Sequence, residues 1–272
     1  MDTTELQLWI GREEAATDTI TAAPVRGLSA TLDRDDPEPR AGDALPLLWH
    51  WLYFLPACRQ SELGRDGHPQ RGGFLPPVPL PRRMWAGSRF EFLRPLRIGE
   101  TIRRVSRIVD IKSKEGRTGP LVFVVVRHEI GDAIVEEHDI VYRGEGGASQ
   151  DPPRAADDAA WERTIRPDDV LLFRYSALTF NGHRIHYDRR YATEVEGYPG
   201  LVVHGPLLAT LMLDLLRRNL PEAAVRRFSF RAVSPLFDTA PFSVCGRPEG
   251  GVVKLWAKNA AGGLAMEATA II

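Results

Sequence analysis

The sequence contains very little cysteine. Its two cysteines, Cys58 and Cys245, lie far apart, and neither belongs to a CxxC pair or to a Cys/His spacing typical of metal ligands. Disulfide frameworks and structural zinc sites need several such residues at short, regular spacings. We therefore expect neither a disulfide framework nor a bound metal.

The sequence also lacks a long apolar run, a leader and a strong net charge. Its most apolar stretch, residues 45–57, contains His50 and Pro56, whereas a membrane span needs ~20 apolar residues. The first five residues, MDTTE, show neither the basic start nor the apolar core of a signal peptide. A net charge of -1 offers no strong attraction for nucleic acid or an anionic membrane. These absences favour a cytoplasmic protein that binds neither nucleic acid nor membrane.

The composition is that of a globular protein long enough for two domains. The chain has 272 residues, of which 43% are hydrophobic and 26% charged, and typical domains hold ~100–150 residues. Residues 144–158, GEGGASQDPPRAADD, form a Gly/Pro/Ala/acidic stretch without apolar periodicity. We predict an N-terminal domain over residues 1–143, a linker over 144–158 and a C-terminal domain over 159–272.

The two halves repeat one order of signals, which indicates a degenerate internal duplication. In the first half, residues 45–60 favour a helix and 64–83 a Pro/Gly-rich loop. Strand patterns follow at residues 88–93, 101–112, 121–130 and 133–143. The second half has strand patterns at residues 228–233, 240–247, 252–258 and 264–271.

The clearest helix in the sequence begins at His204. In HGPLLATLMLDLLRRNL the apolar residues Leu207, Leu208, Leu211 and Leu215 recur at helical spacing. Pro206 suits the first helical turn, and Pro221 follows the expected end. One long apolar helix followed by antiparallel strands is the order expected for a sheet that curls around a helix.

The segment 173–192, FRYSALTFNGHRIHYDRRYA, resembles the signature of the MaoC-like and hydroxyacyl-thioester dehydratases. In that family an Asp is followed by an Asn-Pro pair and by a His five positions after the Asp. Here His186 takes the His position and Asn181 the Asp position, while His183 and Arg184 replace the Asn-Pro pair. The later His204-Gly205-Pro206 resembles the family's His-Gly pair that opens the central helix.

The resemblance implies an α+β double-hotdog fold, with two hotdog domains that each wrap a curled antiparallel sheet around a long helix. Residues 84–87, MWAG, resemble a degenerate copy of the helix-opening turn, so one working site is expected, in the second half. The implied substrate is an acyl thioester of coenzyme A or acyl carrier protein, without any other cofactor. We expect a homodimer or a monomeric pseudo-dimer.

The reaction implied is addition of water to a 2-enoyl thioester, or its reverse. Water must lose a proton as it attacks C3, C2 must gain one, and negative charge develops on the thioester oxygen. Histidine exchanges protons near neutral pH, so His186 is the expected acid/base, with Asn181 orienting the water. His183 is either a second proton carrier or a support for the loop. The N–H of Gly205, at a helix N-terminus, is expected to stabilise the developing oxyanion.

Several of these residues have a structural alternative. Asn181 beside Gly182 is also a common turn pair. Arg184 either supports the loop or faces a phosphate, and His204 is expected to cap or buttress the helix. Tyr175 and Ser176, expected on a strand, line the acyl pocket or pack in the core. The tryptophans Trp49, Trp51 and Trp85 of the degenerate half line an acyl tunnel or, as we expect, pack in the core.

Two other functions stay open. Hydrolysis of the thioester would use the same helix N-terminus and an acid, for which Asp188 is the nearest candidate. The absence of an acid at Asn181 also allows a module that binds acyl thioesters without turnover. Substrates in this branch range from fatty-acyl groups to short branched or dicarboxylic groups such as mesaconyl and itaconyl.

Overall fold

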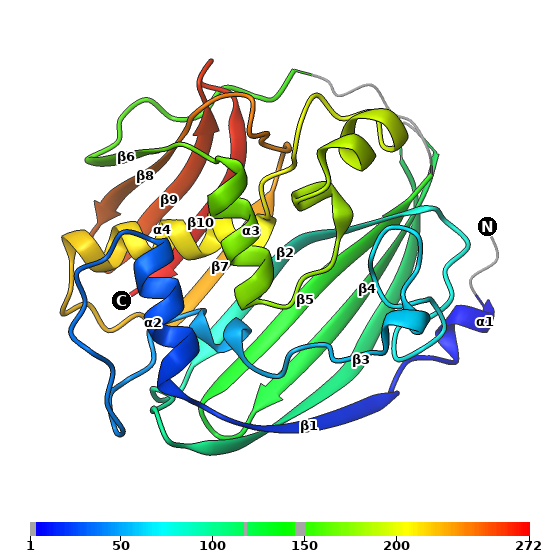
Figure 1. Ribbon diagram of the computed structural model, residues 1–272, viewed down its shortest axis with the longest axis horizontal. Helices are drawn as coiled ribbons and strands as arrows, with labels where there is room; N and C mark the ends of the chain where they lie inside the picture. The colour runs from blue at the N-terminus through cyan, green and yellow to red at the C-terminus, as the bar shows by residue number, and fades with distance from the viewer. Residues whose placement is uncertain (1–3, 117–118, 145–150) are drawn as a thin grey trace.

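A computed structural model describes residues 4–116, 119–144 and 151–272, and within them the strands form one antiparallel sheet (Figure 1). The ten-stranded sheet has the order β1-β3-β4-β5-β2-β7-β10-β9-β8-β6. The strands are β1 (Glu13–Thr19), β2 (Arg82–Phe92), β3 (Thr101–Gly116), β4 (Gly119–Ile130), β5 (Ile134–Arg143), β6 (Trp161–Ile165), β7 (Arg227–Ala232), β8 (Phe242–Glu249), β9 (Val252–Asn259) and β10 (Leu264–Ile271).

The two halves of the sheet share one strand topology. Strands β1 to β5 and strands β6 to β10 follow the same order from the outer edge of the sheet to its centre, as a pseudo-two-fold relation requires. The expected boundary at residues 144–158 stays a prediction, and residues 145–150 of it lie outside the described part of the chain. Both outermost strands, β1 and β6, are short and were not predicted from the sequence.

The halves join where β2 pairs with β7, from Gly87 opposite Arg231 to Glu91 opposite Arg227. A Cβ atom on Gly87 would lie 2.4 Å from the carbonyl oxygen of Phe230, so only glycine permits this approach. Phe90 and Phe228 pack across the seam with ring centroids 5.9 Å apart. The apolar core is therefore continuous between the halves.

The second half wraps its sheet around the predicted helix, α4 (Gly205–Asn219). Ten successive residues, Leu207 to Leu216, are buried, and the helix contacts β6, β8, β9 and β10. Figure 1 shows α2 (Ala22–Thr31) and α3 (Asp169–Leu178) in front of α4. The remaining short elements are α1 (Thr4–Gln7), η1 (Trp49–Leu52), η2 (Gln60–Glu62), η3 (Arg184–His186) and the π-helical turn η4 (Tyr191–Val195).

The helix expected over residues 45–60 is wrong. Only the single turn η1 forms there, between Leu48 and Phe54, whose positive φ angles of 66° and 54° lie outside the right-handed helical region. Pro56, which cannot donate a backbone hydrogen bond, follows two residues after Phe54. The apolar residues of this segment are buried as an irregular chain rather than as a helical stripe. The first half thus has no counterpart of α4 among its described residues.

A buried polar cluster occupies the inner face of the first half. Glu136, which is 2% exposed, accepts hydrogen bonds from Trp51 Nε1 at 3.1 Å and from His138, and its other oxygen lies 3.0 Å from His50 Nε2. Trp85 packs on His138 with ring centroids 4.2 Å apart. The first half is therefore filled by aromatic and charged side chains where the second half holds a helix.

Two further expectations are wrong. Residues 84–87 do not open a helix but lie in β2, where they pair with β5. Tyr175 and Ser176 lie in helix α3 and not on a strand, because the side chain of Asp168 accepts the N–H of Leu171 at 2.8 Å and starts a helix. Among the described residues, no helix is both long and apolar enough to cross a lipid bilayer.

Candidate active site

The segment 181–186 follows α3 and is held in a compact turn. Phe180, with a φ of 49°, ends the helix in the left-handed region. The side-chain oxygen of Asn181 then accepts the N–H of His183 at 2.9 Å, which closes an Asx turn. Asn181 is thus a turn former, and its Nδ2 is the group left to orient a water molecule.

His186 is built to accept a proton at one nitrogen. Its Nδ1 lies 2.7 Å from the carbonyl oxygen of Val202, and because a carbonyl only accepts, Nδ1 carries the hydrogen and Nε2 keeps its lone pair. No described residue forms a hydrogen bond with Nε2. Burial lowers the pKa of His186 to about 3, so the imidazole is neutral near pH 7. This is the protonation state that a general base requires.

The ring of His204 supports the ring of His186. The two rings stack with centroids 3.8 Å apart and an interplanar angle of 18°. His204 Nε2 lies 2.8 Å from Ser176 Oγ, and the ring of Tyr175 packs edge-on against His204. His204 makes no side-chain hydrogen bond to the N-terminus of α4. Of its two expected roles, the geometry therefore favours the buttress over the cap.

Tyr175 is 2% exposed and belongs to the apolar core, which favours packing over an acyl-binding role. Arg184 supports the loop: its guanidinium binds Asp188 Oδ2 at 2.7 Å, lies 4.1 Å above the ring of Tyr191 and donates to the carbonyl of Arg65 at 3.1 Å. Asp188 is consequently occupied by Arg184 and by the N–H of Tyr191. This leaves Asp188 poorly placed to activate water for hydrolysis.

Gly205 begins α4 and leaves space in front of the helix. A Cβ atom at this position would meet only Met266 Cε, at 3.8 Å. No described residue accepts the N–H of Gly205, and Pro206 has no N–H to offer. Free N–H groups and the helix dipole favour a negative charge at such an N-terminus.

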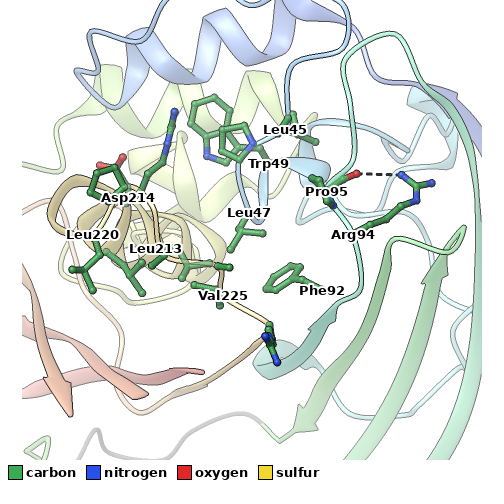
Figure 2. A pocket seen from close by; sticks show the side chains of 18 of the residues that line it. Leu45, Leu47, Trp49, Phe92, Arg94, Pro95, Leu213, Asp214, Leu220 and Val225 are labelled. Carbon is green, nitrogen blue, oxygen red and sulfur yellow. Dashed lines mark hydrogen bonds between the residues drawn. The ribbon is translucent and has the colours of Figure 1, made fainter. Parts of the chain in front are cut away.

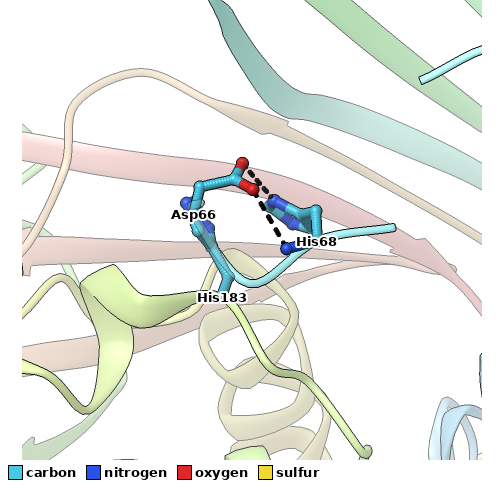
Figure 3. A group of neighbouring side chains, drawn as sticks. All are labelled: Asp66, His68 and His183. Carbon is cyan, nitrogen blue, oxygen red and sulfur yellow. Dashed lines mark hydrogen bonds and ion pairs between the residues drawn. The ribbon is translucent and has the colours of Figure 1, made fainter. Parts of the chain in front are cut away.

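The site also receives side chains that sequence reasoning missed, from the loop of the first half (Figure 3). The ring of His68 lies 4.1 Å from that of His183, which in turn lies 5.3 Å from His186. Asp66 Oδ2 lies 2.9 Å from His68 Nδ1. The sequence shows Asp66 and His68 two positions apart, but no local pattern indicates that they meet residues more than a hundred positions away.

Burial and neighbouring charges set the pKa values of the groups in this cluster. Burial lowers the pKa of His183 to about 3, while the carboxylate of Asp66 opposes that shift and Arg83 adds to it. Burial, the largest single effect, disfavours the ionised form of Asp66, but the hydrogen bonds and charge of His68 together with His183 outweigh it and hold the pKa of Asp66 below its ordinary value. Near neutral pH the cluster thus pairs one carboxylate with several neutral imidazoles.

Asp66, His68 and His183 each offer one ligand-type atom, and these atoms lie within 4.8 Å of one another. Ligand atoms bound at ~2.1 Å to one zinc ion would lie roughly 3.4 Å apart, whereas Asp66 Oδ2 and His68 Nδ1 lie 2.9 Å apart. In the structure, the carboxylate and the imidazole instead bind each other. A chelator experiment below separates the two arrangements.

Two cavities lie near these elements. One of about 350 Å³ borders the cluster and is lined by residues that include Asp66, His68, Arg83 and Glu196. The other, of about 580 Å³, is lined by Trp49, Phe92 and the C-terminal part of α4 (Figure 2). A helix rises ~1.5 Å per residue. The second cavity, which is lined by α4 residues from Leu213 onward, therefore lies at the far end of α4 from His204.

Known proteins resemble this chain in sequence. The family model described as hydroxyacyl-thioester dehydratase type 2 matches residues 48–238. Mesaconyl-C(4)-CoA hydratase of Chloroflexus aurantiacus is 50% identical over 99% of this chain and 98% of its own length. The mitochondrial hydroxyacyl-thioester dehydratase type 2 of Schizosaccharomyces pombe is 29% identical, covering 84% of this chain and 88% of its own.

Solved structures share the fold. HtdX of Mycobacterium tuberculosis superposes with a TM-score of 0.68 at 20% identity, over 94% of this chain and 98% of that one. A second protein of the same organism, described as a double hotdog fold, has a TM-score of 0.53 at 13% identity, over 96% of both chains. The double-hotdog fold that the sequence predicts is confirmed.

Proposed function

Because the chain belongs to the hydroxyacyl-thioester dehydratase type 2 family, we propose that it hydrates the 2,3 double bond of a mesaconyl-type coenzyme A thioester, or catalyses the reverse. It is a hydro-lyase of the hydratase/dehydratase class. The observation that carries the substrate proposal is the 50% identity to a mesaconyl-C(4)-CoA hydratase over almost the whole of both chains. Coenzyme A is the expected carrier, rather than an acyl carrier protein.

In the proposed mechanism, His186 Nε2 removes a proton from water while the water oxygen bonds to C3. The electron pair of the double bond moves toward the thioester oxygen, which the N–H of Gly205 and the N-terminus of α4 stabilise. The imidazolium of His186 then returns the proton to C2, so one O–H bond breaks and one C–O and one C–H bond form. Asn181 Nδ2 orients the water, and His183 and His204 hold the ring. This sequence needs no metal or other cofactor.

Arg83 is our candidate for recognition of a second carboxylate. Mesaconic acid is a dicarboxylic acid, so its monothioester keeps one free carboxylate. Arg83 lines the 350 Å³ cavity together with His68, and no carboxylate of the described residues forms an ion pair with it. Arginine binds carboxylates through paired hydrogen bonds. Arg184, by contrast, already holds Asp188.

The test is a direct assay of the purified chain with mesaconyl-, itaconyl- and crotonyl-coenzyme A and with a saturated ester. Hydration removes the enone absorbance without releasing thiol, hydrolysis releases thiol, and a binding module does neither. Arg83→Gln should raise KM for mesaconyl-coenzyme A far more than for crotonyl-coenzyme A, which has no second carboxylate. An equal effect on both esters would contradict the assignment of Arg83.

We propose a monomeric pseudo-dimer or a homodimer in the cytoplasm. The joined β2 and β7 support the pseudo-dimer within one chain. Light scattering of the purified protein distinguishes one chain from two. The relative from Schizosaccharomyces pombe is named as mitochondrial, so cell fractionation is the check on the compartment.

A further inference from the structure

The proposed base His186 has no acidic partner of its own. Its Nδ1 binds a carbonyl, its ring lies on His204, and position 181 holds a neutral amide. When a buried imidazole takes a proton from water it becomes a cation, and a buried cation is costly without a nearby counter-charge. A histidine cluster that carries this proton therefore needs a carboxylate within reach.

Asp66 is the carboxylate that the structure places there. It binds His68 at 2.9 Å, and His68 packs on His183, which packs edge-on against His186. The other acids near the site are occupied: Asp188 by Arg184, and Glu196 by the hydroxyl of Tyr191. Asp66 has no arginine or lysine partner among the described residues, so its charge acts on the histidines.

The turn that carries Asp66 is fixed against the segment 181–186 by backbone contacts. The N–H of Arg184 donates to the carbonyl of Asp66 at 2.9 Å. Gly67, with a φ of 87°, lies so close to Gly182 that a Cβ atom on Gly67 would fall 1.9 Å from the Gly182 oxygen. Within the turn, the N–H of Gly64 donates to the carbonyl of His68 at 2.7 Å. The two segments are therefore docked as one unit.

We propose that Asp66 of the first half is the acidic member of the active site, which orients His68 and stabilises the positive charge that forms on the histidine cluster during water addition. It is a positioning residue, because it acts through His68. The proposal rests on the proposed hydratase function. It means that the working site is shared between the halves, although the proton acceptor itself lies in the second.

The first test is Asp66→Asn, which removes the charge but keeps an oxygen to accept the N–H of His68. We expect kcat to fall about 10- to 100-fold, as for other partners that orient a reacting group, with KM nearly unchanged. The acidic limb of the kcat profile should move to lower pH, because losing a negative charge lowers the pKa of the neighbouring imidazoles. Besides Asp66, the charged or titratable groups that face His68 are Arg71 and Arg83. Those that face His183 are His68, Arg83 and His204, and those that face His186 are His183 and His68.

The matched control is Asp35→Asn. This carboxylate is exposed and makes no hydrogen bond or ion pair with a described residue, so its removal changes the net charge alone and should leave kcat and the pH profile as in the wild type. A role of Asp66 in merely holding the loop would lower the melting temperature without moving the pH profile. That pattern would overturn the proposal.

The second test moves the charge. Asn181 adjoins His183, so the double variant Asp66→Asn/Asn181→Asp returns a carboxylate to the cluster from the other side. Because Asn181→Asp also removes the Nδ2 that is proposed to orient the water, the double variant is compared with Asn181→Asp alone. In that background Asp66→Asn should lower kcat by less than about threefold. If Asp66→Asn costs the same factor there as in the wild type, the charge of Asp66 is not what matters. If Asp66→Asn does not fold, His68→Gln replaces it, and an unchanged kcat there overturns the proposal.

The remaining outcomes are also distinguishable. A wild type that hydrates no enoyl thioester contradicts the proposed function, whereas an active wild type with an equally active Asp66→Asn contradicts only the role of Asp66. Loss of activity in EDTA, restored by zinc, would assign Asp66, His68 and His183 to a metal and overturn the charge role. We expect EDTA to have no effect.

Discussion

At the scale of single residues, the proposed role of His186 as the base can be tested most directly. His186→Gln retains a polar side chain but has no basic nitrogen, and we expect kcat to fall by about 10² to 10⁴, the usual contribution of a general acid or base. KM should change little, because the proposed role is in proton transfer. The measurement is steady-state loss of enone absorbance. Near-normal activity of His186→Gln together with an inactive His183→Gln would move the base to His183.

Glu136 offers a second residue-scale prediction, this time on stability. Burial would raise its pKa, but His138 and His50 hold it well below the ordinary value, so it is an ion in the core. Removing this carboxylate leaves its buried hydrogen-bond partners unsatisfied, which typically costs about 1–3 kcal/mol. We expect Glu136→Ala to lower the free energy of unfolding by that amount in a urea titration. Glu91→Gln, at an exposed position on β2, should change it by less than about 0.5 kcal/mol.

At the scale of elements, the sequence predicts those helices and strands whose formation depends on residues that are close in the sequence. The helix α4 was predicted from the spacing of its leucines, and β7 to β10 from β-rich runs between turns. The helix predicted over residues 45–60 does not form, because two residues beside η1 adopt left-handed backbone conformations. Those backbone conformations depend on packing against the first half of the sheet. The short edge strands β1 and β6 carry too few apolar residues to show a period.

The candidate site divides in the same way. The segment 181–186 and the start of α4 were found from their motif, because those residues are close in sequence. Asp66 and His68 were missed, since the contact that brings them to His183 is a backbone approach between Gly67 and Gly182. No single-sequence pattern records such an approach.

The docked turn gives an element-scale prediction. Gly67→Ala would force the turn away from Gly182, so we expect at least a tenfold lower kcat. Gly72→Ala is the matched control: its φ of 88° is nearly the same as that of Gly67, but a Cβ there meets nothing within 4 Å. Both variants should lose about 1 kcal/mol of stability from the strained backbone. Equal kcat values for the two would show that the close contact does not position the site.

At the scale of the whole molecule, the buried histidines make stability depend on pH. Burial lowers the pKa values of the five histidines His68, His128, His183, His186 and His204 in the folded chain. As pH falls below the ordinary value of 6.5, the unfolded chain binds protons that the folded chain refuses, so folding weakens. We expect the melting temperature to drop between about pH 6.5 and pH 5. A flat profile over that interval would contradict the burial of these groups.

The pseudo-symmetry of the sheet leads to a prediction on stoichiometry. The sequence of the first half has no copy of the segment 181–186, and its described residues form no helix in the place of α4. Calorimetric titration with a saturated acyl-coenzyme A analogue should therefore give one site per chain. Two equal sites would contradict the inequivalence of the halves.

The seam between β2 and β7, together with the turn at Asp66, makes the halves mutually obligate. Produced as separate polypeptides, residues 1–143 would expose an unpaired β2, and residues 159–272 would hold a proton acceptor without its counter-ion. Mixing the fragments should re-form the seam and bring the carboxylate back to the imidazoles. Activity would then rise with the concentration of the limiting fragment, as in fragment complementation. In that case the two halves would act as the subunits of a heterodimer that one chain joins covalently.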